Sequence, residues 1–151
     1  MSTAVAEPTT LRTLAPLYFV EDIARSVKFY EHMLDFRLTQ AWEPEGRLMW
    51  CQMTRNDVGI MLQQICAEDH LPQPRGAGVT LYIHCDDAED VFLRLQERGV
   101  DVDPPITTFY GMKQVYVTDP DGYGLCFQNP VDTNGLLPDA CGHDASGQHA
   151  P

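Results

Sequence analysis

The chain has 151 residues, with 22 acidic against 10 basic side chains and a formal charge of −12. That length favours one domain with a shared core. The charge argues against nucleic-acid and anionic-membrane partners, since both need clustered Lys and Arg.

The first half of the chain has the pattern of a strand, a helix and three further strands. Residues 1–12 form an expected flexible arm, and an apolar strand is expected at 14–20. The acids Glu21-Asp22 follow as an expected helix N-cap. The helix is indicated by apolar residues at helical spacing, namely Ile23, Val27, Tyr30 and Leu34. Extended segments follow at 36–42, 47–54 and 58–65, with a turn at 55–57 between the last two.

The second half has the same pattern after a Pro- and Gly-containing surface linker at 67–77. A strand is expected at 78–85, and the acids Asp86-Asp87 form an expected N-cap. The helix face is formed by Ala88, Val91, Phe92 and Leu95 and ends near Gly99. Extended segments are expected at 100–102, 112–118 and 123–128. A Pro-Gly turn at 119–122 joins the last two, and residues 131–151 form an expected flexible tail.

The two halves are an internal repeat. A shift of 64 residues aligns eight identical residues over about 51 positions, where roughly three would match by chance. A β-α-β-β-β unit of about 50 residues cannot bury enough surface alone. We therefore expect a single domain over 13–130, built from module one (13–66) and module two (78–130).

Three segments carry a resemblance to a known family: FVEDIARSVKFYEHMLDF at 19–36, YIHCDDAEDVFLRLQERGV at 82–100 and GMKQVYVTDPDGYGLCF at 111–127. The chain resembles the vicinal oxygen chelate superfamily, which includes glyoxalases, bleomycin-resistance proteins and extradiol dioxygenases. The resemblance implies an α+β fold, in which two tandem βαβββ modules form a curled, barrel-like mixed sheet with a concave cleft.

Enzymes of this superfamily hold a divalent metal with a His on the first strand and a Glu on the last strand of each module. The corresponding positions are expected to be Pro16, Leu62 or Met61, Thr80 and Cys126. Such a set does not suit a hard ion. We therefore expect no metal and no other cofactor.

Strand alternation and loop position instead predict an aromatic and amide-rich ligand site. The candidate ligand-binding residues are Tyr18, Trp42, Trp50, Gln52, Tyr82, His84, Phe109, Tyr110, Met112, Gln114, Tyr116 and Gln128. No catalytic residue is predicted. The plainer interpretations are that the aromatics fill the core, that His84 is structural or solvated and that Cys126 is an inert thiol.

Among superfamily members, the chain is closest in character to the metal-free bleomycin-resistance proteins. We expect a metal-independent protein that binds a small molecule, for example a cationic or aromatic antibiotic, at the cleft of a homodimer. The alternatives are an enzyme of the same superfamily (a lyase, isomerase, thiol transferase or dioxygenase) with a non-standard metal site or none, and an interaction module without a small ligand.

The five cysteines are scattered and form no C-x-x-C motif, which indicates free thiols rather than disulfides or a zinc module. Together with the absence of a signal peptide or an apolar span at the sequence level, this predicts a cytoplasmic protein. In the tail, Cys141, His143 and His149 could hold adventitious metal.

Overall fold

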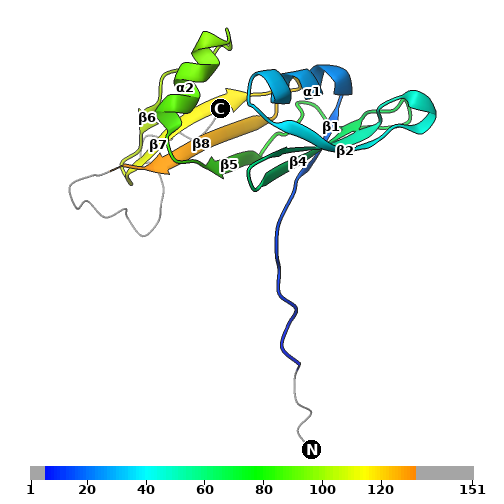
Figure 1. Cartoon of the computed structure of the whole chain (residues 1–151), viewed down its shortest axis with the longest axis horizontal. Helices are drawn as coiled ribbons and strands as arrows, with labels where there is room; N and C mark the ends of the chain where they lie inside the picture. Colours follow the sequence, from blue (N-terminus) through cyan, green and yellow to red (C-terminus); the bar gives the residue numbers. More distant parts are fainter. Residues whose placement is uncertain (1–5, 132–151) are drawn as a thin grey trace, which may run out of the picture.

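The computed structural model describes residues 6–131 and consists of two βαβββ modules (Figure 1). Module one contains β1 (Leu17–Val20), α1 (Ile23–His32), β2 (Arg37–Trp42), the short 3-10 helix η1 (Pro44–Gly46), β3 (Trp50–Arg55) and β4 (Val58–Gln64). Module two contains β5 (Thr80–His84), α2 (Ala88–Glu97), β6 (Ile106–Thr107), β7 (Met112–Thr118) and β8 (Gly124–Pro130).

Each module forms its own four-stranded mixed sheet, in the orders β1-β4-β3-β2 and β5-β8-β7-β6. The first strand of each module pairs in parallel with the last, and the remaining pairs are antiparallel. The predicted α+β class and the tandem modules are confirmed. The two sheets stay separate, however, and do not close into a barrel.

The helices begin where the acids predict. Asp22 accepts a hydrogen bond from the Arg25 N–H at 3.2 Å, and Asp87 accepts from the Glu89 N–H at 3.0 Å. These carboxylates satisfy N–H groups that have no partner within the helix. Gly99, after α2, has a φ of 77°, the left-handed conformation that glycine adopts without strain.

One expected strand is wrong. Residues 100–102 form no strand, although Val100 and Val102 pack against the core. The apolar alternation reflects this packing rather than sheet pairing. Pro104 and Pro105, which follow, have no N–H to donate to a neighbouring strand. The third element of module two is accordingly the short strand β6, which starts only at Ile106.

Both helices lie on the same side of the two sheets (Figure 1). The side chains beneath α1 and α2 form one continuous core, in which Tyr30, Leu62, Leu95 and Leu125 are at most 1% exposed. We call this side of each sheet the helix-covered face and the opposite side the helix-free face. Neither helix of residues 6–131 has the length and apolar character needed to cross a membrane.

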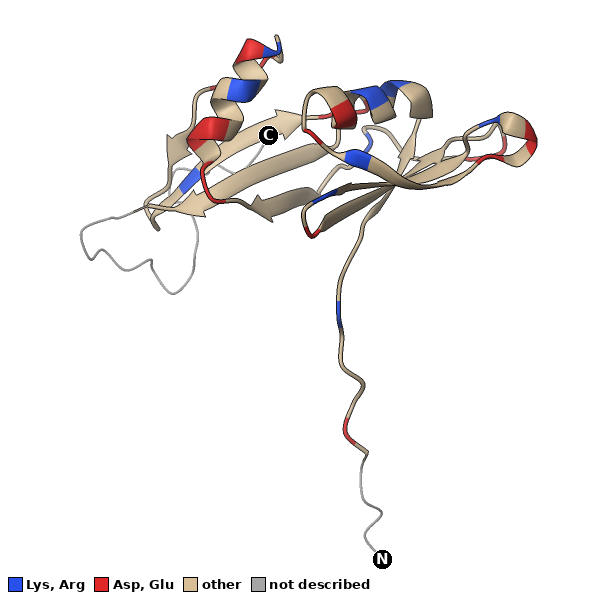
Figure 2. Cartoon of the chain, viewed as in Figure 1, with Lys and Arg blue, Asp and Glu red and all other residues tan. Residues whose placement is uncertain are grey.

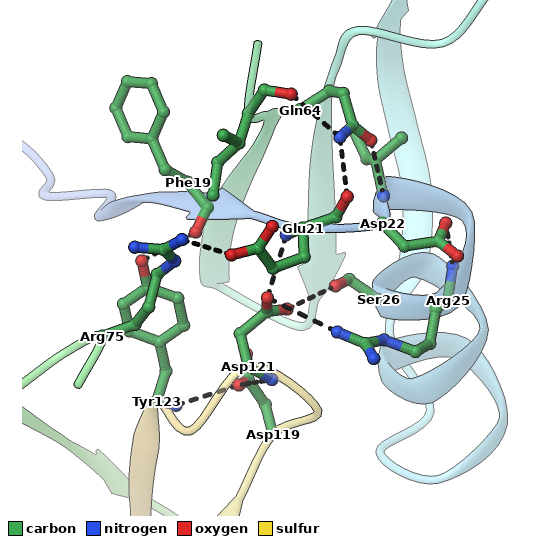
Figure 3. A network of polar contacts seen from close by, with 12 residues as sticks. Phe19, Glu21, Asp22, Arg25, Ser26, Gln64, Arg75, Asp119, Asp121 and Tyr123 are labelled. Atoms are coloured by element: carbon green, nitrogen blue, oxygen red, sulfur yellow. Dashed lines mark hydrogen bonds and ion pairs between the residues drawn. The ribbon is translucent and has the colours of Figure 1, made fainter. Parts of the chain in front are cut away.

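The modules are joined by polar contacts around the turn 119–123 (Figure 3). The Glu21 N–H donates to Asp121 Oδ1 at 2.9 Å, and the Ser26 hydroxyl donates to Asp121 Oδ2 at 3.2 Å. The Tyr123 hydroxyl donates to the carbonyl oxygen of Phe19 at 2.7 Å. Because β1 is an edge strand, this bond satisfies a backbone acceptor that the sheet leaves unpaired.

The linker between the modules is more than the surface segment that its composition predicts. The Arg75 side chain is only 9% exposed and forms an ion pair with Glu21 (Figure 3). A Cβ on the next residue, Gly76, would lie 2.6 Å from the Tyr123 ring. The linker therefore packs closely against the junction of the two modules.

Candidate functional site

The register of strand pairing decides which side chains share the helix-free face. In module one, Trp50 pairs with Gln63, while Gln52 pairs with Met61 and Met61 with Leu17. Residues directly opposite each other in a sheet point to the same side. The predicted residues Trp50 and Gln52 therefore lie on the helix-free face of module one.

In module two the pairing places every predicted strand residue on the helix-free face. Tyr82 pairs with Cys126, which pairs with Tyr116. One step along the sheet, His84 pairs with Gln128, which pairs with Gln114. Met112 shares this side because it lies two residues before Gln114 on β7.

The prediction that Tyr18 shares a face with Trp50 and Gln52 is wrong. Tyr18 pairs with Leu62, which pairs with Cys51, so all three lie on the helix-covered face. Tyr18 is only 6% exposed and stacks on Tyr123 with ring centroids 3.9 Å apart. Its ring belongs to the junction between the modules.

The physical reason is a one-residue difference between the sequence repeat and the structural repeat. The N-caps Asp22 and Asp87 are 65 positions apart. The same spacing separates Leu17 on β1 from Tyr82, the residue at the corresponding position of β5. A shift of 64 residues therefore aligns residues that lie on opposite faces of their sheets, such as Tyr18 with Tyr82. A slip of one residue exchanges the two sides of a strand.

The positions expected to match metal ligands divide between the two faces. Leu62 lies in the core, whereas Met61 and Cys126 lie on the helix-free face, as does Thr80, two residues before Tyr82. Alternation places Pro16, just before β1, on the helix-covered side. The helix-free set of methionine, threonine and cysteine does not fit a hard divalent ion. Within residues 6–131, no three His, Cys, Asp or Glu side chains come close enough to form a metal site.

Five of the predicted ligand-binding residues form a hydrogen-bonded network in module two, which we call the tyrosine–glutamine network. The Tyr116 hydroxyl donates to Gln114 Oε1 at 2.8 Å and lies 3.2 Å from the Tyr82 hydroxyl. Gln114 Nε2 donates to Gln128 Oε1 at 2.9 Å and to the Tyr110 hydroxyl oxygen at 3.2 Å. Gln114 thus links the hydroxyls of Tyr116 and Tyr110 to the side-chain amide of Gln128.

Two titratable groups on this face, the Tyr116 hydroxyl and the Cys126 thiol, have raised pKa values. Burial raises the pKa of the Tyr116 hydroxyl. Burial also raises the pKa of the Cys126 thiol to about 12, against a smaller lowering by Tyr116. Because the thiolate is the nucleophile, Cys126 is not an activated cysteine.

Aromatic rings are exposed at the helix-free face and at its edge. Trp42 is 59% exposed and pairs across the strands with Trp50, and Tyr82 is 42% exposed. Phe109, in the β6–β7 connection, is 40% exposed and contacts Tyr110 edge to face, with ring centroids 5.1 Å apart. Such rings can stack on a flat ligand.

The structure brings the candidates together in two groups. Trp42, Trp50 and Gln52 belong to module one, and the residues of the tyrosine–glutamine network, with His84, Phe109 and Met112, belong to module two. The helix-free faces of both modules lie opposite the helices, on one common side of the chain (Figure 1). Within one chain they therefore form a continuing surface rather than two walls that face each other.

The predicted ligand-binding set lacks four residues of the helix-free face of module one, namely Leu17, Phe19, Met61 and Gln63. Met61 is expected only as the alternative to Leu62 at a metal-ligand position. The spacing of the two N-cap acids was the signal that could have revealed these four residues. Counting the repeat between Asp22 and Asp87 gives 65 and assigns the correct side of β1. The matching Leu and Tyr residues at a shift of 64 were a weaker guide to the repeat than the N-cap spacing, because both residue types occur on both faces of the sheets.

The acids lie away from these sheet faces. Between residues 6 and 131, none of the eight strands contains Asp or Glu (Figure 2). A cavity of about 570 Å³ with Asp86, Asp87 and Asp90 at its wall opens between the modules. Two of these carboxylates already have structural partners, because Asp87 caps α2 and Asp90 pairs with Arg94 at 2.9 Å.

Comparison with known proteins agrees with this architecture. The model of the "Glyoxalase/Bleomycin resistance protein/Dioxygenase superfamily" matches residues 11–127. No curated protein matches the chain.

Solved structures give the same result. TnmS3, an antibiotic binding protein from Streptomyces sp. CB03234, is 26% identical with a TM-score of 0.61, over 82% of this chain and 100% of that one. A glyoxalase/bleomycin resistance protein from the same Streptomyces is 27% identical with a TM-score of 0.60, over 76% and 97%. A glyoxalase/bleomycin resistance protein/dioxygenase from Nocardioides, 16% identical with a TM-score of 0.64 over 83% and 88%, shares the fold.

Proposed function

Because the chain belongs to the Glyoxalase/Bleomycin resistance protein/Dioxygenase superfamily, we propose that it binds a small aromatic molecule without a metal ion. The observation that carries this proposal is the helix-free face of module two. It combines the exposed ring of Tyr82 with the buried amides of Gln114 and Gln128. Stacking surfaces beside a few placed polar groups are typical of small-molecule sites.

The ligand is proposed to be an antibiotic that the protein sequesters unchanged. TnmS3 is an antibiotic binding protein, and its 26% identity over its whole length supports this use of the fold. Sequestration needs only affinity. The side chains suit that role, because Cys126 is a protonated thiol and the His84 ring has no carboxylate partner among the described residues.

The complete site is proposed to need a homodimer. The two helix-free faces lie on one side of the chain (Figure 1), so a second copy is required to place a module-two face opposite a module-one face. Leu17, Trp42, Tyr82 and Phe109 are each at least 40% exposed on or beside this side. Covering apolar surface of this kind favours association.

A binding screen tests the proposal. The full chain is heated with aromatic antibiotics or with divalent metals, and a tight ligand raises the melting temperature by mass action. We expect a shift with at least one aromatic antibiotic and its recovery with unchanged mass. Recovery of a modified compound would instead identify an enzyme.

Two variants locate the site. Tyr82→Ala is expected to weaken binding by about fivefold, because an aromatic contact contributes on the order of 1 kcal/mol. Leu93→Ala, at an exposed position on α2, is the matched control and should bind like the parent. Equal affinity of Tyr82→Ala and the parent would show that the ligand lies elsewhere.

Metal dependence is tested by elemental analysis of the full chain and of a variant with Cys141, His143 and His149 replaced. These three residues lie outside the described part of the chain. A stoichiometric divalent metal retained by the variant, together with loss of antibiotic binding on chelation, would contradict a metal-independent mode.

A further inference from the structure

Hydrogen positions in the tyrosine–glutamine network follow from its geometry. A tyrosine hydroxyl has one hydrogen, and an amide carries two hydrogens on nitrogen and none on oxygen. Tyr116 uses its hydrogen on Gln114 Oε1. At the 3.2 Å contact between the hydroxyls, Tyr116 is therefore the acceptor and Tyr82 the donor.

The other end of the network follows in the same way. Gln114 Nε2 uses both hydrogens, one on Gln128 Oε1 and one on the Tyr110 hydroxyl oxygen. Tyr110 thus accepts from Gln114, and its own hydrogen has no acceptor among the described residues. Gln128 has engaged its oxygen, and its Nε2 has no partner within residues 6–131.

Burial makes this arrangement costly to disturb. Gln114 is 1% exposed and Gln128 is 8% exposed. A buried amide that loses its partners keeps the full cost of removal from water. Both amide hydrogens and the oxygen of the Gln114 side chain are engaged. Gln114 therefore determines that Tyr116 donates to it and that the Tyr110 hydroxyl accepts from it.

We infer that the module-two face selects planar aromatic ligands that carry a hydrogen-bond acceptor such as a carbonyl oxygen, and that Gln114 sets this preference. The inference rests on the proposed function and specifies its ligand class. The Tyr110 hydroxyl and the Gln128 amide nitrogen are both available as hydrogen-bond donors. The exposed rings of Tyr82 and Phe109 lie in the same module. A ligand that offers only N–H donors would leave both of these hydrogen-bond donors without a partner.

Charge supports a neutral acceptor over a cation. The strands that form the face contain no Asp or Glu. The net charge of −12 can attract a cation over a distance, but the described strands of the face offer no carboxylate to pair with it.

Three planar probes of similar size test the inference with the full chain. Fluorenone has a carbonyl oxygen, fluorene has the same rings without it, and proflavine is cationic with N–H donors. We expect fluorenone to bind about fivefold more tightly than fluorene, as for one neutral hydrogen bond, and more tightly than proflavine at physiological salt. Quenching of tyrosine and tryptophan fluorescence gives the affinities.

Variants test the role of Gln114. Tyr110→Phe removes one free donor and should reduce the preference for fluorenone over fluorene several-fold. Gln114→Leu should reduce the same preference, and Gln96→Leu, at an exposed position on α2, is the matched control. If Gln114→Leu fails to fold, Tyr110→Phe still decides the outcome.

The outcomes separate this inference from the proposed function. Equal binding of fluorenone and fluorene, or a preference for proflavine, would overturn the acceptor preference while leaving a small-molecule site. Antibiotic binding without any fluorenone binding would also overturn it. Failure of every probe and every antibiotic to bind would reject the proposed function as well.

Discussion

The rings of Tyr18 and Tyr123 stack with centroids 3.9 Å apart and planes inclined by 5°. One ring comes from β1 of module one, and the other comes from the turn before β8 of module two. The Tyr123 hydroxyl also donates to the Phe19 carbonyl oxygen at 2.7 Å. This pair connects the two modules through both apolar contact and a hydrogen bond.

Tyr123→Ala should therefore destabilise the whole domain. Loss of a large aromatic side chain from a packed site costs about 3 kcal/mol. Tyr123→Phe keeps the ring and should cost only about 1 kcal/mol for the lost hydrogen bond. Urea denaturation measures both free energies of unfolding, and equal losses for the two variants would show that stacking contributes little.

Tyr30→Phe should destabilise the chain in a pH-dependent way. The Tyr30 hydroxyl donates to Asp119 Oδ2 at 2.9 Å, and both residues are at most 4% exposed. Its loss leaves a buried acceptor unpaired, at a cost of about 1–3 kcal/mol. Denaturation at neutral pH measures this cost.

The sign of the pH effect follows from Asp119. Burial raises its pKa, while hydrogen bonds from Tyr123 and Tyr30 lower it. A carboxyl whose pKa is higher in the folded than in the unfolded chain contributes to the free energy of unfolding when it is protonated. This contribution is complete below the pKa of the unfolded chain and is lost as pH rises through the pKa of the folded chain. Tyr30→Phe raises that pKa further, so the difference between parent and variant should be larger at pH 7 than at pH 4. In an Asp119→Asn background the difference should not change with pH.

Alkylation should separate the cysteines by burial. Burial raises the pKa of Cys126 to about 12 and that of Cys51 to about 11, and both side chains are 0% exposed. Among Cys51, Cys66 and Cys126, half-buried Cys66 should therefore react first with iodoacetamide at pH 8, and the other two only after unfolding. Mass spectrometry of peptides gives the order. Rapid native labelling of Cys126 would identify an activated thiol.

Two arginines should differ in their effect on stability. The Arg75 side chain is 9% exposed and pairs with Glu21, whereas the Arg94 side chain is 54% exposed and pairs with Asp90 within α2. Arg75→Ala should cost about 2 kcal/mol, because it removes packed side-chain stem and a charged hydrogen bond at the module junction. Arg94→Ala, the matched control, should cost under about 1 kcal/mol. Equal costs in urea denaturation would mean that the linker does not support the junction.

Local patterns predicted most of the fold. Asp22 and Asp87 cap their helices, and Gly99 has the expected left-handed conformation, because these features depend on residues adjacent in the chain. The Pro-Gly turn before β8 is confirmed for the same reason, with Gly122 at a φ of 98°. Alternation also placed the module-two candidates correctly, because β5, β7 and β8 all share the predicted parity.

The side of β1 and the hydrogen-bond network depended on contacts between distant residues. Tyr18 lies in the core because of its register against β4, which is 44 residues away in the chain. The contacts of Arg75 with module one have the same origin. Sequence periodicity describes one strand at a time and leaves its register against a partner open.

The sequence by itself thus determined the two βαβββ modules and their helix ends, since each follows from side chains and local spacing. Only the tertiary structure decided which side of β1 is buried and that Gln114 connects Tyr116, Tyr110 and Gln128. Strand register and hydrogen-bond direction are set when separate strands meet, and no single segment of the chain contains that information.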